Sequence, residues 1–480
     1  MAVGPEDRGD LPKATGPPRR RRAEPRRRRQ DPVVARSQLL AAGLELVAER
    51  SLGDTLGHLR INDLARDAGL TSGAFYHYWD NQDAYRAEVL DALLAGHRVE
   101  TEPGLFTADD ELDPAVTFDA VGRRVQARLL ADPGHRLELA LWAHDDPAAR
   151  PRLRARAEEA DAAMARTLAP CLARSGRGPG TGWDLAELAT ATVTLSDGLR
   201  TLHLIDPAVV TQSVDGDGRA WNAPGLLALV LLLGGTEPGP APAAPPTTVG
   251  EPTSVEDNPR RRRLVDLGVT AARQRPTGNA FDHIRADDVA RRLGLTIGAF
   301  YHYWESQDDY RDDLIDALFA AERYVDPGAV ATQDQMIGGA EDLDAAIRDT
   351  TTWYWSVAAG HPDNRVQFAF HTLDDPYITP RLASWHADLR RAWHQVLDTL
   401  LAHFGRNWRD PLGTEIVVWG MSAALDGLIV RHGLDPRGLD PGTDGWTRWG
   451  RTCQALVMAG SAPEGDDRDL PTLAKEALAG

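Results

Sequence analysis

The sequence predicts an all-α protein made of two tandem helical units. Nearly the same fourteen residues occur twice, as "GAFYHYWDNQDAYR" from Gly73 and "GAFYHYWESQDDYR" from Gly298. Aligned without a gap, residues 58–94 and 283–319 are identical at 22 of 37 positions, and matches such as "DDPAARPRL" with "DDPYITPRL" extend the repeat further. Neither copy has sustained strand alternation. Two copies of a whole two-part unit are therefore joined end to end.

Helical spacing and caps predict the elements of the first copy. "VVARSQLLAAGLELVAER" places apolar residues largely on one helical stripe, and "RINDLARDAGL" is a short helix ending at Gly69. Thr71 can cap the next helix, because its hydroxyl accepts from free N–H groups of the first turn. Two short helices separated by a turn, the second opening with small residues, are the helix-turn-helix pattern that places its second helix in the DNA major groove.

The residues after the turn make this pattern specific. "TSGAFYHYW" and "TIGAFYHYW" follow "DLARDAGL" and "DVARRLGL", and with them the sequence resembles the TetR family of bacterial repressors over about 60 residues in each copy. The resemblance implies an N-terminal three-helix DNA-binding domain and a C-terminal helical domain for effector binding and dimerisation. The C-terminal halves resemble the family only in helical pattern.

The resemblance and the composition together divide the chain into seven segments. We expect a disordered Arg-rich arm at 1–30, helix-turn-helix domains at 31–98 and 260–325, helical effector and dimerisation domains at 99–235 and 326–462, a Pro-rich linker at 236–259 and a C-terminal tail at 463–480.

The resemblance also implies which residues face DNA. Phe75 and Trp79, with Phe300 and Trp304, should anchor each second helix to the core of its domain. The residues expected to contact DNA are Arg60, Asn62, Thr71, Ser72, Gly73, Tyr76, His77, Tyr78 and Gln82 in the first copy, and Arg285, Asp287, Thr296, Ile297, Gly298, Tyr301, His302, Tyr303 and Gln307 in the second.

Two differences between the copies fall where the family reads bases. Ser72 corresponds to Ile297, and Asn62 corresponds to Asp287. Serine and asparagine can hydrogen-bond base edges, whereas isoleucine can contact only a thymine methyl group and aspartate prefers a cytosine amino group. The two half-sites are therefore expected to share a core and differ at one or two base pairs, with neutral drift of surface positions as the alternative.

The electrostatic contribution to DNA binding must come from outside the motif. Gln82 and Gln307 stand where the family commonly has a lysine that contacts phosphate, and the net charge of the chain is -18. Arg60, Arg285 and the arginine runs before each copy are the candidates, because a flexible basic arm can enter the minor groove. Solvated, disordered segments with no such role are the alternative for these runs.

The second copy holds most of the tryptophans. Trp353, Trp355, Trp385, Trp393 and Trp419 could line a pocket for a flat or cationic effector, and plain core packing is the alternative. The histidines lack the tight spacing of a zinc site, so we expect no metal and no cofactor. The apolar run from Leu226 to Leu233 is too short to cross a bilayer, and the N-terminus has no secretory h-region, so we expect a cytoplasmic protein without membrane association.

The resemblance implies a sequence-specific, ligand-responsive transcriptional repressor. We do not expect an enzyme, since no nucleophile with a base, phosphate loop or metal cluster is found. The expected partners of such a regulator are a double-stranded DNA operator and a small-molecule effector. Because a two-fold operator needs two heads, one fused chain can act as a pseudo-dimeric monomer, and a homodimer with four heads is the alternative. A helical scaffold or ligand-sensing protein that has lost DNA binding is the competing function.

Overall fold

The computed structural model describes thirteen stretches of the chain and six single positions before them. The single positions are Asn62, Leu64, Ala65, Thr71, Gly73 and Tyr76. The stretches are residues 78–95, 114–131, 134–145, 147–206, 212–215, 218–240, 243–245, 285–292, 294–319, 327–361, 364–373, 378–436 and 444–478. The predicted arm at 1–30 and most of the predicted linker lie outside them.

The prediction of a helical protein is confirmed. In the described part of the first half, the helices are α4 (Gln82–Ala95), α5 (Pro114–Ala131), α6 (Gly134–Ala143), α7 (Ala149–Arg174), α8 (Leu185–His203) and α9 (Ala223–Gly235). The strands are only three residues long: β1 (Arg177–Pro179) pairs with β4 (Thr236–Pro238), and β2 (Gln212–Val214) pairs with β3 (Ala220–Asn222), both antiparallel.

The described elements of the second half repeat most of this order, without a described counterpart of the β2–β3 pair and with α20 in addition. Its helices are α11 (Ala286–Arg292), α12 (Ile297–Phe300), α13 (Gln307–Leu318), α14 (Pro327–Gly339), α15 (Leu343–Ala358), α16 (Asn364–His371), α17 (Ile378–His403), α18 (Thr414–Leu434), α19 (Arg448–Gly460) and α20 (Leu470–Leu478), and β5 (Arg406–Trp408) pairs with β6 (Ser461–Pro463). The helices α7 and α17, and likewise α8 and α18, begin 229 residues apart, whereas α4 and α13, and α9 and α19, begin 225 apart.

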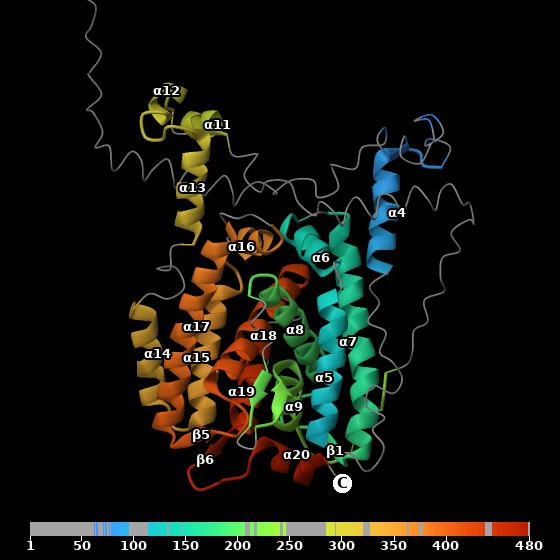
Figure 1. The fold of residues 1–480 in the computed structure, drawn as a ribbon, viewed down its shortest axis with the longest axis vertical. Coiled ribbons are helices and arrows are strands. Elements are labelled where there is room, and N and C mark those ends of the chain that lie inside the picture. The colour runs from blue at the N-terminus through green and yellow to red at the C-terminus, as the bar shows by residue number, and fades with distance from the viewer. Residues whose placement is uncertain are drawn as a thin grey trace, which may run out of the picture.

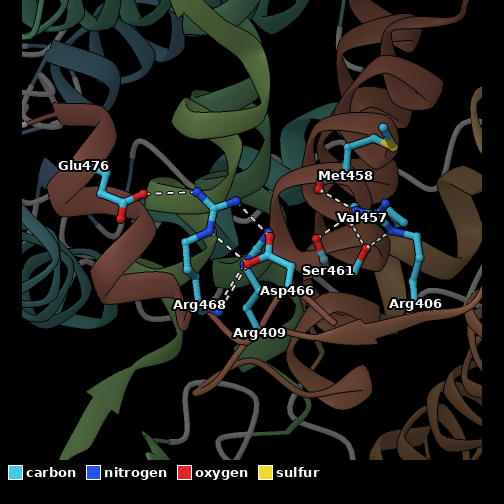
Figure 2. Close-up of polar contacts among 8 residues, drawn as sticks. All are labelled: Arg406, Arg409, Val457, Met458, Ser461, Asp466, Arg468 and Glu476. Carbon is cyan, nitrogen blue, oxygen red and sulfur yellow. Dashed lines mark hydrogen bonds and ion pairs between the residues drawn. The ribbon is translucent and has the colours of Figure 1, made fainter. Parts of the chain in front are cut away.

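Individual contacts recur at the same offsets. Arg177 donates from Nε to Thr236 Oγ1 over 2.8 Å, and Arg406 donates from Nε to Ser461 Oγ over 2.8 Å. Figure 2 shows Arg406 between this serine and the backbone of α19. Each arginine therefore ties the C-terminal end of α9 or α19 to the short strand that follows α7 or α17.

Caps explain where several helices begin. Asp184 accepts from the Glu187 N–H while the Glu187 carboxylate accepts from the Asp184 N–H, which forms a capping box before α8. Thr447 caps α19 by accepting from Gly450 N over 2.9 Å. The run Leu226–Leu233 forms most of α9 and is almost wholly buried, as expected for a helix that is apolar on every side.

The two copies meet through α8 and α18 and through α9 and α19. At the crossing of α8 and α18 the backbones touch: a Cβ atom at Gly198 would lie 1.8 Å from the Ala423 carbonyl oxygen, and one at Gly427 would lie 2.2 Å from the Thr194 carbonyl oxygen. Gly198 and Gly427 are equivalent residues of the two copies, and so are Thr194 and Ala423. The crossing therefore has approximate two-fold symmetry.

The charges at this interface do not repeat. Asp161 in α7 accepts from Arg431 in α18 over 3.0 Å and from the Thr190 hydroxyl over 2.9 Å. Arg390 in α17, the equivalent of Asp161, instead forms an ion pair with Asp206 over 3.5 Å. In a pair of two first copies, an apolar residue would take the place of Arg431 opposite Asp161, and the carboxylate would lose this ion pair. Pairing of unlike copies is therefore favoured.

The C-terminal helix crosses to the other copy. Residues 463–480, expected to be a tail, contain α20, which packs against α5 and α9 of the first copy and buries Leu470. Figure 2 shows the polar contacts before it: Asp466 accepts from Arg409 over 2.7 Å and from Arg468 over 2.8 Å. Hydrogen bonds from Arg468 and Arg409 hold the pKa of the Asp466 carboxyl well below its usual value.

We call the described parts of residues 62–95 and 285–319 the first and second heads, and the remaining helices the body. Figure 1 shows α4 and α13 rising from the same end of the body, with α6 and α16 at the top of the body beneath them. None of the described helices combines the length and the apolar character that a bilayer crossing requires.

Three of the buried histidines in this upper part of the body have lowered pKa values. His371 and His386 have their Nε2 atoms 3.1 Å apart, and His135 Nε2 lies 3.0 Å from Thr201 Oγ1. Burial lowers the pKa of all three imidazoles, that of His371 to about 4, and nearby arginines lower it further for His135 and His386. All three histidines are therefore neutral in the folded protein at pH 7.

The stability of the protein depends on the close contact where α8 crosses α18. Gly198→Ala should lower the free energy of unfolding by about 2 kcal/mol or more, because the new methyl group meets a backbone carbonyl and the helices must separate. Gly338→Ala in α14 is the matched control: its Cβ meets nothing within 4 Å, so it should stabilise by about 0.5–1 kcal/mol. Urea denaturation measures both. Equal effects of the two variants would contradict the close contact.

The buried histidines make the free energy of unfolding depend on pH. Below a pH of about 6.5 the unfolded chain binds protons at histidines that stay neutral when folded, so stability should fall as pH falls toward about 4. His371 alone should cost about 2 kcal/mol between roughly pH 7 and pH 5. Burial raises the pKa of Asp426 to about 8, which gives the opposite slope in this range.

The comparison that isolates His371 is urea denaturation of the wild type and of His371→Asn at both pH values. The contribution of Asp426 is common to the two proteins and cancels. The variant should lose less stability on acidification than the wild type; an equal loss would contradict a neutral, buried His371.

Candidate nucleic-acid interface

The second head is a helix, a turn and a second short helix resting on α13. Ala286, Val289 and Ala290 bury one side of α11. Thr296 caps α12, with its hydroxyl accepting from Ala299 N over 3.3 Å. The regular part of α12 is only Ile297–Phe300, and turns follow from Tyr301 to Tyr303. The second helix is thus a short, capped segment held by what packs beneath it.

Three aromatic side chains form the centre of the second head. The ring centroids of Phe300, Trp304 and Tyr310 lie 4.8 to 5.1 Å apart, and all three side chains are buried. Trp304 Nε1 donates to Asp313 Oδ2 over 2.7 Å, and Trp79 Nε1 donates to Glu88 Oε2 over 2.7 Å in the first head. The predicted anchoring by Trp79, Phe300 and Trp304 is confirmed; Phe75 lies outside the described residues.

The residues expected to face DNA are mostly exposed. In the second head Thr296, Ile297, Gly298, Tyr301 and His302 are exposed. In the first head, among the described positions, Asn62, Thr71, Gly73 and Tyr76 are exposed. The equivalent tyrosines Tyr76 and Tyr301 are 55% and 47% exposed and, with Ile297 at 42%, are the most exposed large apolar side chains of the described residues. Tyr76, Tyr301 and Ile297 therefore place apolar surface on both heads.

Other predicted positions are less available. Tyr78 and Tyr303 are half-buried and pack against the apolar core of their heads. Gln82 and Gln307 are half-buried at the first positions of α4 and α13. Arg60, Ser72 and His77 lie outside the described residues.

The second head carries both signs of charge. Arg285 is exposed, while Asp287 forms an ion pair with Arg291, which also contacts Asp288 over 3.1 Å. Any contact of Asp287 with a cytosine must therefore compete with this arginine.

Equivalent ion pairs connect each head to the body. Arg152 in α7 donates from Nη2 to Asp91 Oδ2 over 3.1 Å, and Arg381 in α17 donates from Nε to Asp316 Oδ1 over 2.5 Å. The ring of Phe319 adds an apolar connection at the end of the second head, 5.1 Å from the ring of Phe370 between centroids. These contacts therefore couple the long body helices α7 and α17 to the helices α4 and α13 of the two heads.

The tryptophans expected to line an effector pocket do not converge on one. Trp353 and Trp393 border a cavity of only about 10 Å³, room for about one water molecule. Trp355 lies against His432, and Trp385 lies against His386. Trp419 lies beneath Arg390, whose guanidinium carbon is 4.1 Å from the centroid of the indole ring. A larger cavity, of about 120 Å³, lies between the two copies. Its arginines could not be predicted from the sequence, because side chains far apart in the chain create the cavity.

No protein-family model matches the chain, and no curated protein matches it significantly. Among the described residues, no three His, Cys, Asp or Glu side chains gather as metal ligands would.

Proposed function

We propose that the chain is a sequence-specific DNA-binding transcriptional regulator in which two helix-turn-helix heads act as an intramolecular pseudo-dimer. One observation supports this most strongly: the equivalent aromatic residues Tyr76 and Tyr301 are both exposed, and α4 and α13 of the heads that carry them rise from the same end of one body. Two heads related by approximate two-fold symmetry match a pseudo-palindromic duplex, whose half-sites carry the same relation.

The sequence differences between the two heads would determine which operator sequence the chain prefers. Thr296, Gly298 and Tyr301 have identical counterparts in the first copy, so we propose that they read the shared core of both half-sites. Ile297 replaces Ser72 and offers only an apolar surface, which suits contact with a thymine methyl group. The preferred sequence is then an imperfect palindrome.

Regulation would use the connection between head and body. Arg152 with Asp91, and Arg381 with Asp316, connect long body helices to the helices behind the reading surfaces. An effector that changes the spacing of α7 and α17 would change the spacing of the heads, and DNA binding would fall. We therefore propose ligand-responsive repression as the mode of action.

The third prediction tests this function. Duplexes selected by the wild type from a random library should form an imperfect palindrome. Tyr301→Ala should bind the selected duplex on the order of tenfold more weakly in fluorescence anisotropy, because it loses contacts at a base edge or phosphate. Ile297→Ser should shift the preference in one half-site toward that of the other.

Val357→Ala is the matched control, because Val357 is an exposed apolar residue of the body, 41% exposed. It should bind DNA as the wild type does. Failure of the wild type to enrich any sequence at low salt would contradict the proposal and favour a scaffold. Equal binding by Tyr301→Ala and Val357→Ala would contradict a DNA contact at Tyr301.

A further inference from the structure

The cavity between the copies is lined by charged and apolar side chains together. It has a volume of about 120 Å³ and lies between the N-terminal part of α8 in the first copy and α18 and α19 in the second. Its lining includes Glu187 and Thr190 from the first copy, and Arg448, Arg451 and Trp446 from the second. An apolar cavity of roughly 150 Å³ accepts benzene, so this one has room for a group of similar size.

The equivalent place on the other side of the approximate two-fold axis is filled. Five polar positions of the cavity correspond to apolar residues there: Glu187 to Ile416, Thr190 to Trp419, Arg448 to Ala223, Arg451 to Leu226 and Thr452 to Leu227. These five apolar residues are all at most 8% exposed. The packing is tight, since a Cβ atom at Gly420 would lie 2.5 Å from Leu227 Cδ2.

Polar residues at these positions cost stability unless they serve another purpose. Charged groups lose hydration in a partly enclosed cavity, whereas the apolar residues of the equivalent place add packing. On one side of the axis the chain fills this place with apolar side chains. On the other side it keeps an open cavity with charged side chains. The asymmetry therefore indicates a site for a ligand, present once per chain.

One arginine is fixed in the cavity wall. Arg451 forms an ion pair with Asp444, and its guanidinium lies against Gly182, where a Cβ atom would be 2.2 Å from Nη2. Gly182 has a φ of +79°, a conformation that other residues adopt only with strain. The Trp446 ring lies beside this arginine, 5.4 Å from its guanidinium carbon. Arg451 is thus held in place before any ligand arrives.

A second arginine supplies the charge for the ligand. The Arg448 guanidinium makes no hydrogen bond or ion pair with any residue that the structure describes, although it lies near enough to Asp161 to interact with it electrostatically. The other charges of the lining are engaged: Asp444 with Arg451, and Glu187 with the Asp184 N–H. Arg448 is left to pair with an anion, and the indoles of Trp183 and Trp446 offer surfaces for a flat group.

We propose that this cavity binds one small planar carboxylate per chain, with the carboxylate on Arg448 and the flat group between the two indoles. The role of this cavity as the effector site of the regulator rests on the proposed function, but the binding of a carboxylate to the cavity does not. A ligand here would touch α8 and α19 from different copies, so its binding is expected to change how the copies pack.

The fourth prediction uses benzoate as the probe in isothermal titration calorimetry of the full chain. Benzoate should bind saturably with one site per chain, and the uncharged benzamide should bind on the order of tenfold more weakly or not at all. Arg448→Gln should weaken benzoate binding on the order of tenfold, whereas Arg391→Gln, at an exposed arginine of α17, should not. Thr190→Trp, which copies the filled side, should abolish binding.

Circular dichroism of each variant shows whether it is folded, and inorganic phosphate tests whether any anion suffices. Saturable binding of phosphate with equal affinity would overturn the planar carboxylate. Two benzoates per chain, benzoate binding by Arg448→Gln within about twofold of the wild type, or no saturable binding up to about 10 mM would also overturn the site. Benzoate binding without DNA binding would leave the site standing and remove the regulator; DNA binding without benzoate binding would do the reverse.

Discussion

The backbone contact between α8 and α18 is the constraint on which the rest of the structure depends. At Gly198 and Gly427 no side chain separates the two helices, so each glycine lies against a carbonyl group of the other copy. This closeness brings α9 against α19 and brings α20 across to the first copy. It also holds both heads on one end of one body, which is the arrangement that a two-fold DNA site requires.

Fusion allows the two sides of this contact to differ, which two identical subunits cannot do. Asp161 and Arg390 occupy equivalent positions with opposite charge, and each meets a partner in the other copy. The cavity beside Arg448 corresponds, on the other side of the axis, to a place around Trp419 that is filled by apolar side chains. An approximately symmetric body can therefore present two similar heads and a single ligand site, and one ligand would act on both heads through a shared interface.

Much of the fold could be predicted from the sequence because it depends on local patterns. The repeated "GAFYHYW" indicated the buried positions of Phe300 and Trp304, and helical spacing indicated the class. The candidate ligand site could not be predicted, because Arg448 and Thr190 meet only after the copies pack. The number of tryptophans in the second copy does not determine where their rings point. Nothing local in residues 463–480 indicates that α20 packs against apolar helices of the first copy.

The most direct test of a built-in pseudo-dimer is native mass spectrometry of the complex with a selected duplex at moderate salt. We predict one 52.3 kDa chain per specific duplex, because both heads of one chain bind the two half-sites. Two chains per duplex, with one chain unable to bind alone, would contradict it and would mean that the fusion added heads without replacing a partner subunit.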